Sequence, residues 1–439
     1  MTKETPKSYH NSIIYEVFVR NHGPNGTFAD VEKDLVRIRN LGVDIVWLMP
    51  IYPIGEKNRK GKLGCPYSIS DYRRINPEYG NLDDFRHLIK KAHNLGLKVI
   101  IDIVFNHTAH DSFLVNKHPN WFVQDKNHNP ISTIPNWSDV VNLKHSVPGL
   151  RSYLIETLIY WVQNGVDGFR CDIASFLPLG FWIDARETIG QIKPHTIWLA
   201  ESVHAEDIPK RRENGLPGVS DSELYQAFDF TYDYDIWPVW QATILGKIPT
   251  SRLIEMLRFQ ECIYPANYIK LRFMENHDQK RIVQFAPSKK QALAWTAFSC
   301  FIEGAFLIYA GQESACAHTP SLFEKDKINW HNYELTQFFK RLFNIKKDLA
   351  ISIGKLIWLS DKPVIQAAWY DLENSLYGIF NTSKIEGYVR VNVPDGNYFD
   401  SLNNNDIIVR EGKLKIPESA SIFHYQPHGK PCSISSVLF

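Results

Sequence analysis

The stretch LDDFRHLIKKAHNLGLKVIIDIVFNH (residues 82–107) contains the repeating unit that decides the fold. Residues 82–96 predict an amphipathic helix that ends at Gly96, since glycine is common just after a helix. Residues 97–107 follow at once as an apolar run, which is typical of a buried strand. Continuous apolar strands that alternate with helices are typical of parallel sheets, because the helices cover both faces of the sheet.

The same unit recurs along most of the chain. Val31, Leu35, Ile38 and Leu41 have helical spacing between two apolar runs. Further helical stretches lie at 150–164, 251–260 and 288–300, and eight strand candidates lie at 13–19, 43–50, 97–107, 166–172, 196–202, 227–232, 268–276 and 305–311. Eight parallel strands separated by helices predict an α/β fold of the closed (β/α)8 type, the TIM barrel.

Two segments depart from this alternation. The first is polar and rich in Pro and Asn, and it is too long for an ordinary loop, so we expect a short inserted domain after the third strand. The second follows a helix at 334–349, where short apolar runs divided by turn residues predict antiparallel β-structure. We therefore assign the barrel to residues 1–106 and 143–352, the insert to 107–142, and a C-terminal β-sandwich domain to 353–439.

The composition argues against several classes of partner and location. A formal net charge of +1 over 439 residues gives no reason to expect nucleic acid or an acidic membrane surface as a partner. No apolar run approaches the ~18 residues of a membrane span, and residues 1–18 lack an apolar core of signal-peptide length. The six cysteines are scattered, which argues against a zinc site or a disulfide framework. We therefore expect a cytoplasmic protein.

Charged and amide side chains end four of the expected strands. In VDGFRCDIAS (166–175), Arg170 and Asp172 are two residues apart and therefore face the same side of a strand. A structural ion pair would explain these two residues alone, because a buried charge needs a partner. Three other strands end in the same way, with Asp102, Asn106 and His107, with Glu201, and with Asn276, His277 and Asp278. Since these strand ends share the rim that carries barrel active sites, the sequence predicts a catalytic cluster there.

Four of these stretches together resemble the signature of the alpha-amylase family of retaining glycoside hydrolases (glycoside hydrolase family 13). They are DIVFNH (102–107), GFRCDIAS (168–175), LAESVH (199–204) and FMENHDQ (273–279), in the family's order and spacing. PYSISDYRRINPEYG (66–80) and FLIYAGQE (306–313) also fit, so the resemblance spans roughly residues 13–350. The resemblance implies an enzyme that cleaves α-1,4-glucosidic bonds in maltodextrins or related α-glucans through a covalent glycosyl-enzyme intermediate.

The resemblance implies a role for each carboxylate. Asp172 would be the nucleophile, Glu201 the general acid/base, and Asp278 the third carboxylate, which orients the sugar and stabilises the transition state. Retaining cleavage needs an attacking carboxylate and a protonating carboxyl group about 5 Å apart. We expect Arg170 to lower the pKa of Asp172, because an opposite charge favours the ionised form.

Further positions are implied to contact the sugar. His107 and His277 would bond hydroxyls of the cleaved unit, and Tyr67 would stack on its ring. Arg281 would contact sugar farther toward the non-reducing end. The aromatic content of 13% fits sugar stacking, and it equally fits a large aromatic core.

The chain departs from the family pattern near the nucleophile. Starch-cleaving members commonly carry Lys-His where this chain has Ser175 and Phe176, which favours shorter maltodextrins as substrates. Trp121 and Trp137 in the insert leave two alternatives open. They are either platforms for sugar or packing residues within the insert's own small core.

A second departure concerns calcium. Many family members bind a structural Ca²⁺ between barrel and insert, through an Asn that matches Asn106 and through carboxylates late in the insert. In WSDVVNLKH (137–145), Asn142 and Lys144 stand where those carboxylates would be expected. Ca²⁺ prefers several anionic oxygens, so we expect no required cofactor and no metal ligand. Lys144 would then lie near the position of the ion. In the alternative, Lys144 points to solvent and backbone oxygens still hold a weak ion.

Two alternative functions share this sequence pattern. A transglycosylase or a sucrose-type glucosyltransferase would use the same three carboxylates and pass the glycosyl group to a sugar instead of water. A non-catalytic sugar-binding or transport-accessory barrel would be expected to lack part of the triad and to carry a membrane span. The expected partner is an α-glucan oligosaccharide, with neither nucleic acid nor membrane.

Overall fold

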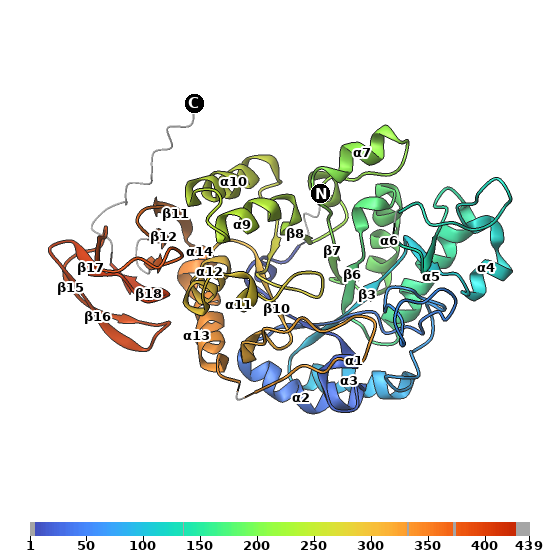
Figure 1. The fold of residues 1–439 in the computed structure, drawn as a ribbon, viewed down its shortest axis with the longest axis horizontal. Helices are drawn as coiled ribbons and strands as arrows, with labels where there is room; N and C mark the ends of the chain where they lie inside the picture. The colour runs from blue at the N-terminus through green and yellow to red at the C-terminus, as the bar shows by residue number, and fades with distance from the viewer. Residues whose placement is uncertain (1–4, 135, 332, 372–374, 427–439) are drawn as a thin grey trace.

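The computed structural model describes residues 5–134, 136–331, 333–371 and 375–426. Its centre is a closed barrel of parallel strands in the order β1-β10-β9-β8-β7-β6-β3-β2, surrounded by helices (Figure 1). The (β/α)8 barrel expected from the sequence is therefore confirmed. The barrel strands are β1 (Ile13–Val17), β2 (Ile45–Leu48), β3 (Lys98–Ile103), β6 (Gly168–Cys171), β7 (Ile197–Ala200), β8 (Phe230–Tyr232), β9 (Lys270–Arg272) and β10 (Ala305–Tyr309).

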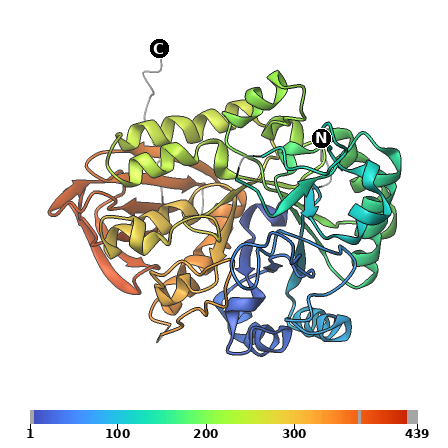
Figure 2. The ribbon, with the colours of Figure 1, turned by 45° about the vertical axis from the view of Figure 1, so that its right-hand side comes forward.

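Helices cover the outside of the barrel in both ribbon views (Figures 1 and 2). Helix α3 shows how the sequence starts them, because the Asn81 side chain accepts hydrogen bonds from the N–H groups of Asp83 and Asp84. Asp84 in turn accepts from the Asn81 N–H, which completes a capping box. In the described part of the chain, no helix combines the length and apolar character needed to cross a membrane.

The helices of the barrel and its loops have the following bounds: α1 (Val19–His22), α2 (Phe28–Leu41), α3 (Leu82–Asn94), α5 (Pro148–Gln163), α6 (Leu179–Ile192), α7 (Asp207–Glu213), α8 (Asp221–Leu224), α9 (Trp237–Ile244), α10 (Thr250–Ile263), α11 (Ile282–Phe285), α12 (Lys289–Phe301), α13 (Thr336–Lys346) and α14 (Leu349–Ile353). Short 3-10 turns are η1 (Lys7–Asn11), η3 (Ala174–Phe176), η4 (Asp233–Asp235) and η5 (Gln312–Ser314).

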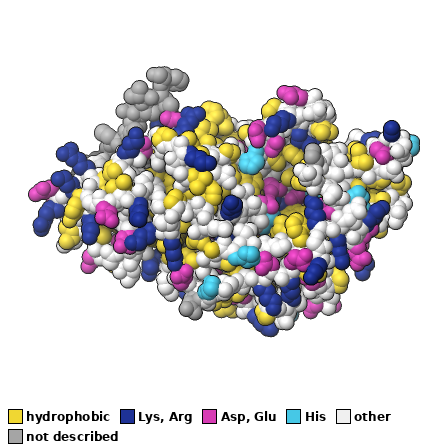
Figure 3. Space-filling model, in the orientation of Figure 1, with side chains coloured by type: hydrophobic (Ala, Val, Ile, Leu, Met, Phe, Trp, Pro, Cys, Tyr) yellow, Lys and Arg dark blue, Asp and Glu magenta, His cyan; other side chains and the backbone are white. Residues whose placement is uncertain are grey.

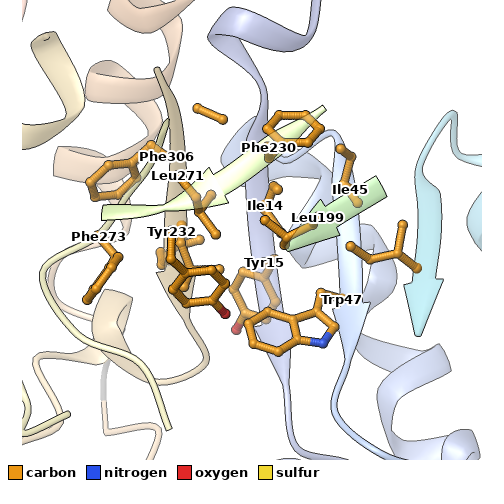
Figure 4. Packing of buried hydrophobic residues seen from close by; sticks show 14 of the residues in the cluster. Ile14, Tyr15, Ile45, Trp47, Leu199, Phe230, Tyr232, Leu271, Phe273 and Phe306 are labelled. Atoms are coloured by element: carbon orange, nitrogen blue, oxygen red, sulfur yellow. The ribbon is translucent and has the colours of Figure 1, made fainter. Parts of the chain in front are cut away.

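Large side chains fill the inside of the barrel. Tyr15, Trp47 and Tyr232 extend toward one another from β1, β2 and β8 (Figure 4). The rings of Trp47 and Tyr232 meet edge to face, with centroids 6.4 Å apart. An eight-stranded barrel is just wide enough for side chains to fill, so we expect ligands to bind at the rim rather than within the barrel.

The segment after β3 forms a small hairpin with one short helix. Strands β4 (His107–Ala109) and β5 (Val140–Asn142) pair antiparallel, and α4 (Phe113–Lys117) and η2 (Pro119–Trp121) lie between them. Trp121 is buried here, stacked on His118 with ring centroids 3.9 Å apart and 5.6 Å from the ring of Tyr153 in α5. This insert therefore packs its own side chains against a barrel helix.

The C-terminal strands form one antiparallel sheet in the order β11-β12-β13-β18-β15-β16-β17-β14. The antiparallel β-structure expected for this domain is therefore confirmed, and pairing continues from β18 to β15 through Asp400 and Phe423. The sheet joins the barrel through α12, where Trp369 Nε1 donates to the Phe301 carbonyl at 2.8 Å. The strands are β11 (Lys355–Ser360), β12 (Ile365–Tyr370), β13 (Ser375–Phe380), β14 (Tyr388–Arg390), β15 (Gly396–Asp400), β16 (Asn405–Arg410), β17 (Lys413–Lys415) and β18 (Ala420–Tyr425).

Candidate active site

The guanidinium of Arg170 lies among buried carboxyl groups at the C-terminal rim of the barrel. Its Nη1 atom lies 2.9 Å from Asp102 Oδ1 and 3.0 Å from Asp172 Oδ1. Its Nη2 atom lies 2.8 Å from Glu201 Oε1. The carboxyl groups come from the ends of β3, β6 and β7, which are neighbours in the barrel. One cation therefore holds three carboxyl groups together, whereas the sequence suggested a pair.

Aromatic rings surround this buried cation. The Cζ atom of Arg170 lies 5.1 Å from the ring centroid of Trp47, 5.6 Å from that of Tyr232 and 5.7 Å from that of Tyr67. Cation–π attraction of this kind offsets part of the cost of removing the guanidinium from water. Arg170 therefore acts as a fixed centre that positions the carboxyl groups.

Asp172 and Glu201 are connected through the backbone of Ile173. The Ile173 N–H donates to Glu201 Oε2 at 2.7 Å. Ile173 has a φ of 33°, a left-handed conformation that is unusual for a β-branched residue and concentrates at functional sites. Asp172 Oδ2 is buried and has no hydrogen-bond partner among the described residues. The arrangement thus leaves one carboxylate oxygen available for attack beside a carboxyl group that is held in place.

The pKa of Asp172 differs from the sequence-based expectation of a low value. Burial raises this pKa well above its usual range, Glu201 raises it further, and Arg170 lowers it only in part. Burial is the largest cause, and Arg170 also contacts Asp102, whose pKa burial raises to about 6. A single cation does not neutralise three carboxylates, so Arg170 offsets the effect of burial on Asp172 only in part.

His277 connects the third carboxylate to β1. Its Nδ1 atom lies 2.5 Å from Oε1 of Glu16, which is fully buried. Its Nε2 atom lies 2.8 Å from Tyr67 Oη and 3.2 Å from Asp278 Oδ2. Burial alone lowers the pKa of His277, but Asp278 and Glu16 raise it well above its usual range. Burial in turn raises the pKa of Asp278, but the His277 cation outweighs burial and lowers it.

A cavity of about 200 Å³ opens above these groups. Figure 3 shows acidic side chains exposed in a hollow near the middle of this face. Burial lowers the pKa of His107 to about 4, so its neutral ring can both donate to and accept from a hydroxyl group. The cavity is lined by Lys60, Cys65, Tyr67, His107, Trp137, Asp139, Val140, Asp172, Ile173, Glu201, His277, Asp278, Leu322 and Phe323. The structure therefore brings together the expected triad, both histidines and Tyr67, with Arg170 beneath them.

Arg281 does not line this cavity, so its expected contact with sugar is wrong for this site. Its side chain is fully buried and pairs with Glu275 at 2.7 Å. It also donates to the carbonyl groups of Ala310 at 2.8 Å and His318 at 3.2 Å. Its sequence position, three residues after Asp278, did not reveal that the guanidinium turns inward to hold two loops.

The two tryptophans of the insert have different surroundings. Trp121 packs on His118 inside the insert, as the second alternative proposed. Trp137 lines the cavity and meets the His107 ring edge-on, with centroids 5.1 Å apart. Trp137 therefore has the position that a sugar platform requires, and Trp121 does not.

The residues after Asp172 build an apolar surface. Ser175 Oγ accepts from the Val203 N–H at 3.3 Å. Phe176 packs near Ile173, Val203 and Ile208, and the Arg211 Cζ atom lies 3.7 Å from its ring centroid. A largely apolar surface therefore stands where the family resemblance would place a polar Lys-His pair.

The residues at the expected calcium position do not fit Ca²⁺. The Asn142 Oδ1 atom already accepts from the Thr133 N–H at 2.7 Å, and Asn142 Nδ2 donates to the Asn106 carbonyl at 3.2 Å. Lys144 is exposed, so its side chain points to solvent rather than to this position. The nearby Asp139 carboxylate pairs with Lys60 at 3.0 Å. With the Asn142 side-chain oxygen already bonded, the position offers little of the anionic oxygen that Ca²⁺ prefers.

The site also contains residues that we did not predict from the sequence, Glu16 and Lys60 among them. Glu16 stands in the strand candidate IIYEVFV (13–19), where a single charge among apolar residues was a signal of the same kind as Arg170. Lys60 lies in a loop without periodicity, and no sequence signal indicated that it would reach the insert. A single charged residue within an apolar strand therefore indicates that a polar or oppositely charged partner lies beside it.

Comparison with known proteins agrees with this geometry. Residues 5–141 and 136–349 match the family described as alpha amylase, catalytic domain, and residues 358–423 match the bacterial alpha amylase C-terminal domain. The crystal structure of an alpha-amylase from Lactobacillus plantarum is similar with a TM-score of 0.92 and 40% sequence identity. That similarity covers 96% of this chain and 100% of the other.

Two curated proteins show a more distant similarity. Alpha-amylase 2 from Dictyoglomus thermophilum is 25% identical over 385 residues, which are 78% of this chain and 64% of that protein. An alpha-1,4-glucan:maltose-1-phosphate maltosyltransferase from Cereibacter sphaeroides is 27% identical over 373 residues, 77% of this chain and 58% of that protein. The chain thus spans less than two thirds of the length of either relative. The two relatives are named for different reactions.

Proposed function

The chain belongs to the alpha-amylase family (glycoside hydrolase family 13), and from that premise we propose that it hydrolyses α-1,4-glucosidic bonds in short maltodextrins with retention of configuration. The observation that carries this proposal is the buried Asp172, whose Oδ2 atom has no hydrogen-bond partner among the described residues. The Arg170 guanidinium contacts both Asp172 and Glu201 and so holds the two carboxyl groups side by side. Retaining hydrolysis needs two such carboxyl groups.

In the first step, an Asp172 oxygen attacks the anomeric carbon and forms an ester bond to it. The glycosidic bond breaks, and its electron pair stays on the departing oxygen, which takes the proton of Glu201. General acid catalysis requires this proton on Glu201 in the reactive complex, with Asp172 ionised. Arg170 contacts both carboxyl groups and stabilises the negative charge that remains.

In the second step, the Glu201 carboxylate removes a proton from water, and the water oxygen attacks the anomeric carbon. The ester bond to Asp172 breaks, and the carboxylate is restored. His277 and Asp278 face the cavity as a donor and an acceptor for sugar hydroxyl groups, and neutral His107 serves either role. Tyr67 and Trp137 offer ring faces on which a pyranose packs.

The second candidate function is glycosyl transfer, which the similarity to a maltosyltransferase suggests. A maltose-1-phosphate donor carries a phosphate group, which proteins bind with cationic side chains or clustered N–H groups. Among the cavity-lining residues, Lys60 is the single Lys or Arg, and it is already paired with Asp139. Four carboxyl groups in the same lining would repel a phosphate. The site thus favours an uncharged glucan donor.

Two further properties belong to this proposal. The enzyme needs no Ca²⁺, which the occupied side-chain amide of Asn142 supports. It acts in the cytoplasm on imported oligosaccharides, which is supported by the free thiols of Cys65, Cys171, Cys262, Cys300 and Cys316.

Product analysis tests hydrolysis against transfer. Maltotriose through maltoheptaose and sucrose would each be incubated with the enzyme, and the products separated by chromatography. We expect shorter glucans with one new reducing end per cleavage. Longer glucans without a matching rise in reducing ends would favour a transglycosylase, and turnover of sucrose alone a sucrose-type glucosyltransferase.

A further inference from the structure

Two loops are joined over one side of the barrel mouth, and we call them together the wall. The first is residues 54–66 after β2, and the second is residues 311–328 after β10 (Figure 1). The Leu63 N–H donates to the Phe323 carbonyl at 3.1 Å. Gly61 has a φ of 66°, and a Cβ atom there would lie 2.6 Å from Phe323 Cβ. The loops therefore pack in direct contact.

Arg20 fixes the wall from within. This fully buried side chain donates from Nη1 to the carbonyl groups of Gly64 and Leu322, both at 3.0 Å. Its Nη2 atom donates to the Leu63 carbonyl at 3.2 Å, and its Nε atom to Glu78 at 3.0 Å. Separating the loops would leave buried donors of the guanidinium without partners, which is costly. The wall is therefore a fixed part of the site.

The wall stands opposite the general acid. In the closed strand order, β10, β1 and β2 are consecutive, and β7 is the fourth strand from β1 in both directions. Glu201 at the end of β7 protonates the departing oxygen, so the leaving group lies on the β7 side of the cleaved bond. The wall loops follow β10 and β2, and they therefore rise on the donor side, where the non-reducing part of a glucan would lie.

The wall also reaches the insert. Lys60 Nζ donates to the Asn136 carbonyl at 2.9 Å and pairs with Asp139 at 3.0 Å. Together with Leu322 and Phe323, Lys60 lines the cavity of about 200 Å³. Pockets that hold drug-sized ligands measure roughly 300–1,000 Å³, so this smaller space suits a short stretch of glucan and not a long run of units.

Building on the proposed function, we infer that the wall ends the donor side of the site, so that the enzyme removes one or two glucosyl units from non-reducing chain ends. Leu322, Phe323 and Lys60 determine this specificity, because they occupy the space through which a longer donor chain would continue. A glucan would enter with its non-reducing end against the wall and its remainder leaving past Glu201.

A substrate blocked at its non-reducing end tests this inference. Maltoheptaose and maltoheptaose carrying a 4,6-O-ethylidene group on its terminal glucose would be compared by initial rates of product formation. We expect the blocked substrate to react at least about 100-fold more slowly, since a displaced substrate loses rates of that order. Similar rates on both substrates would overturn the inference and leave the proposed hydrolysis intact. Turnover of neither substrate would contradict the proposed function instead.

Lowering the wall provides a second, independent readout. The double variant Leu322→Ala, Phe323→Ala shortens two of the wall's side chains that line the cavity but keeps the backbone bonds of the loops. We expect it to raise the ratio of blocked to unblocked rates at least about tenfold. Phe259→Ala, at an exposed position on α10, is the matched control and should leave the ratio unchanged. An active double variant with the wild-type ratio would refute the role of these residues. If the double variant does not fold, the ratio of blocked to unblocked rates of the wild-type enzyme alone decides whether the inference holds.

Discussion

Replacing Glu16 by Gln removes one buried negative charge and preserves the shape of the side chain. Glu16 Oε1 lies 2.5 Å from His277 Nδ1, and both side chains are almost fully buried. Burial lowers the pKa of His277, while Asp278 and Glu16 together raise it well above its usual range. The substitution therefore removes one of the two charges that keep His277 protonated beside Asp278.

The size of the effect follows from the bond that is lost. A hydrogen bond to a charged group contributes about 1.5–3 kcal/mol, and one pKa unit corresponds to about 1.36 kcal/mol. The pKa of His277 should therefore fall in Glu16→Gln, at a cost of about 1.5–3 kcal/mol while its ring is protonated. A raised folded-state pKa stabilises the protein below the unfolded-state pKa, and this stability is lost as pH rises through the folded-state value. The stability deficit of the variant should thus be largest at pH 5–6.5 and shrink at higher pH.

Two measurements check this prediction. NMR of protein labelled with ¹⁵N-histidine would follow the ring nitrogens of His277 with pH, its signals assigned with His277→Gln. Urea unfolding at several pH values would give the free energy of unfolding. Glu56→Gln, at an exposed glutamate, is the control and should match the wild type in both. A neutral His277 ring at pH 7 in the wild type, or the same titration in Glu16→Gln, would refute the reasoning.

Three further changes have defined outcomes. Asp172→Asn should lower kcat by about 10⁴-fold or more with the fold intact by circular dichroism, since covalent catalysis has no substitute; retention of a tenth of the rate would exclude Asp172 as the nucleophile. Dialysis against EDTA should leave the thermal midpoint unchanged, and a drop of several degrees reversed by Ca²⁺ would show that the calcium position was misread. Lys270→Met should lower the free energy of unfolding by about 3–5 kcal/mol, because Lys270 is fully buried between Asp221 and Asp235. The exposed Lys355→Met is its control, and equal stability of the two variants would contradict this account.

The sequence was informative where side-chain periodicity decides the structure. The alternation of apolar strands with helices predicted the barrel, because each strand must bury both faces. The spacing of Arg170 and Asp172 placed both on one face, and the charges at the ends of four strands indicated a common rim. These features depend on the spacing of residues that are close together in the sequence, so they can be recognised before the fold is known.

What the sequence missed depends on contacts between distant segments. Burial and the nearby Glu201 reversed the expected pKa shift of Asp172, and only the assembled barrel reveals them and the sharing of Arg170 with Asp102. Arg281 turned inward to Glu275 rather than toward the sugar. The left-handed conformation at residue 173 could not be predicted, because the residue there is Ile and not Gly. The pairing of β15 with β18 in the C-terminal domain joins strands that are not consecutive in the chain, and no local pattern indicated it.

The stereochemistry of the first product tests the central claim most directly. Proton NMR of maltopentaose during the first minutes of reaction would record the anomeric signal of each newly formed reducing end. Because Asp172 and then water each invert the anomeric centre, the account predicts that the α-anomer forms first and the β-anomer follows by mutarotation. Initial release of the β-anomer would contradict the covalent role of Asp172.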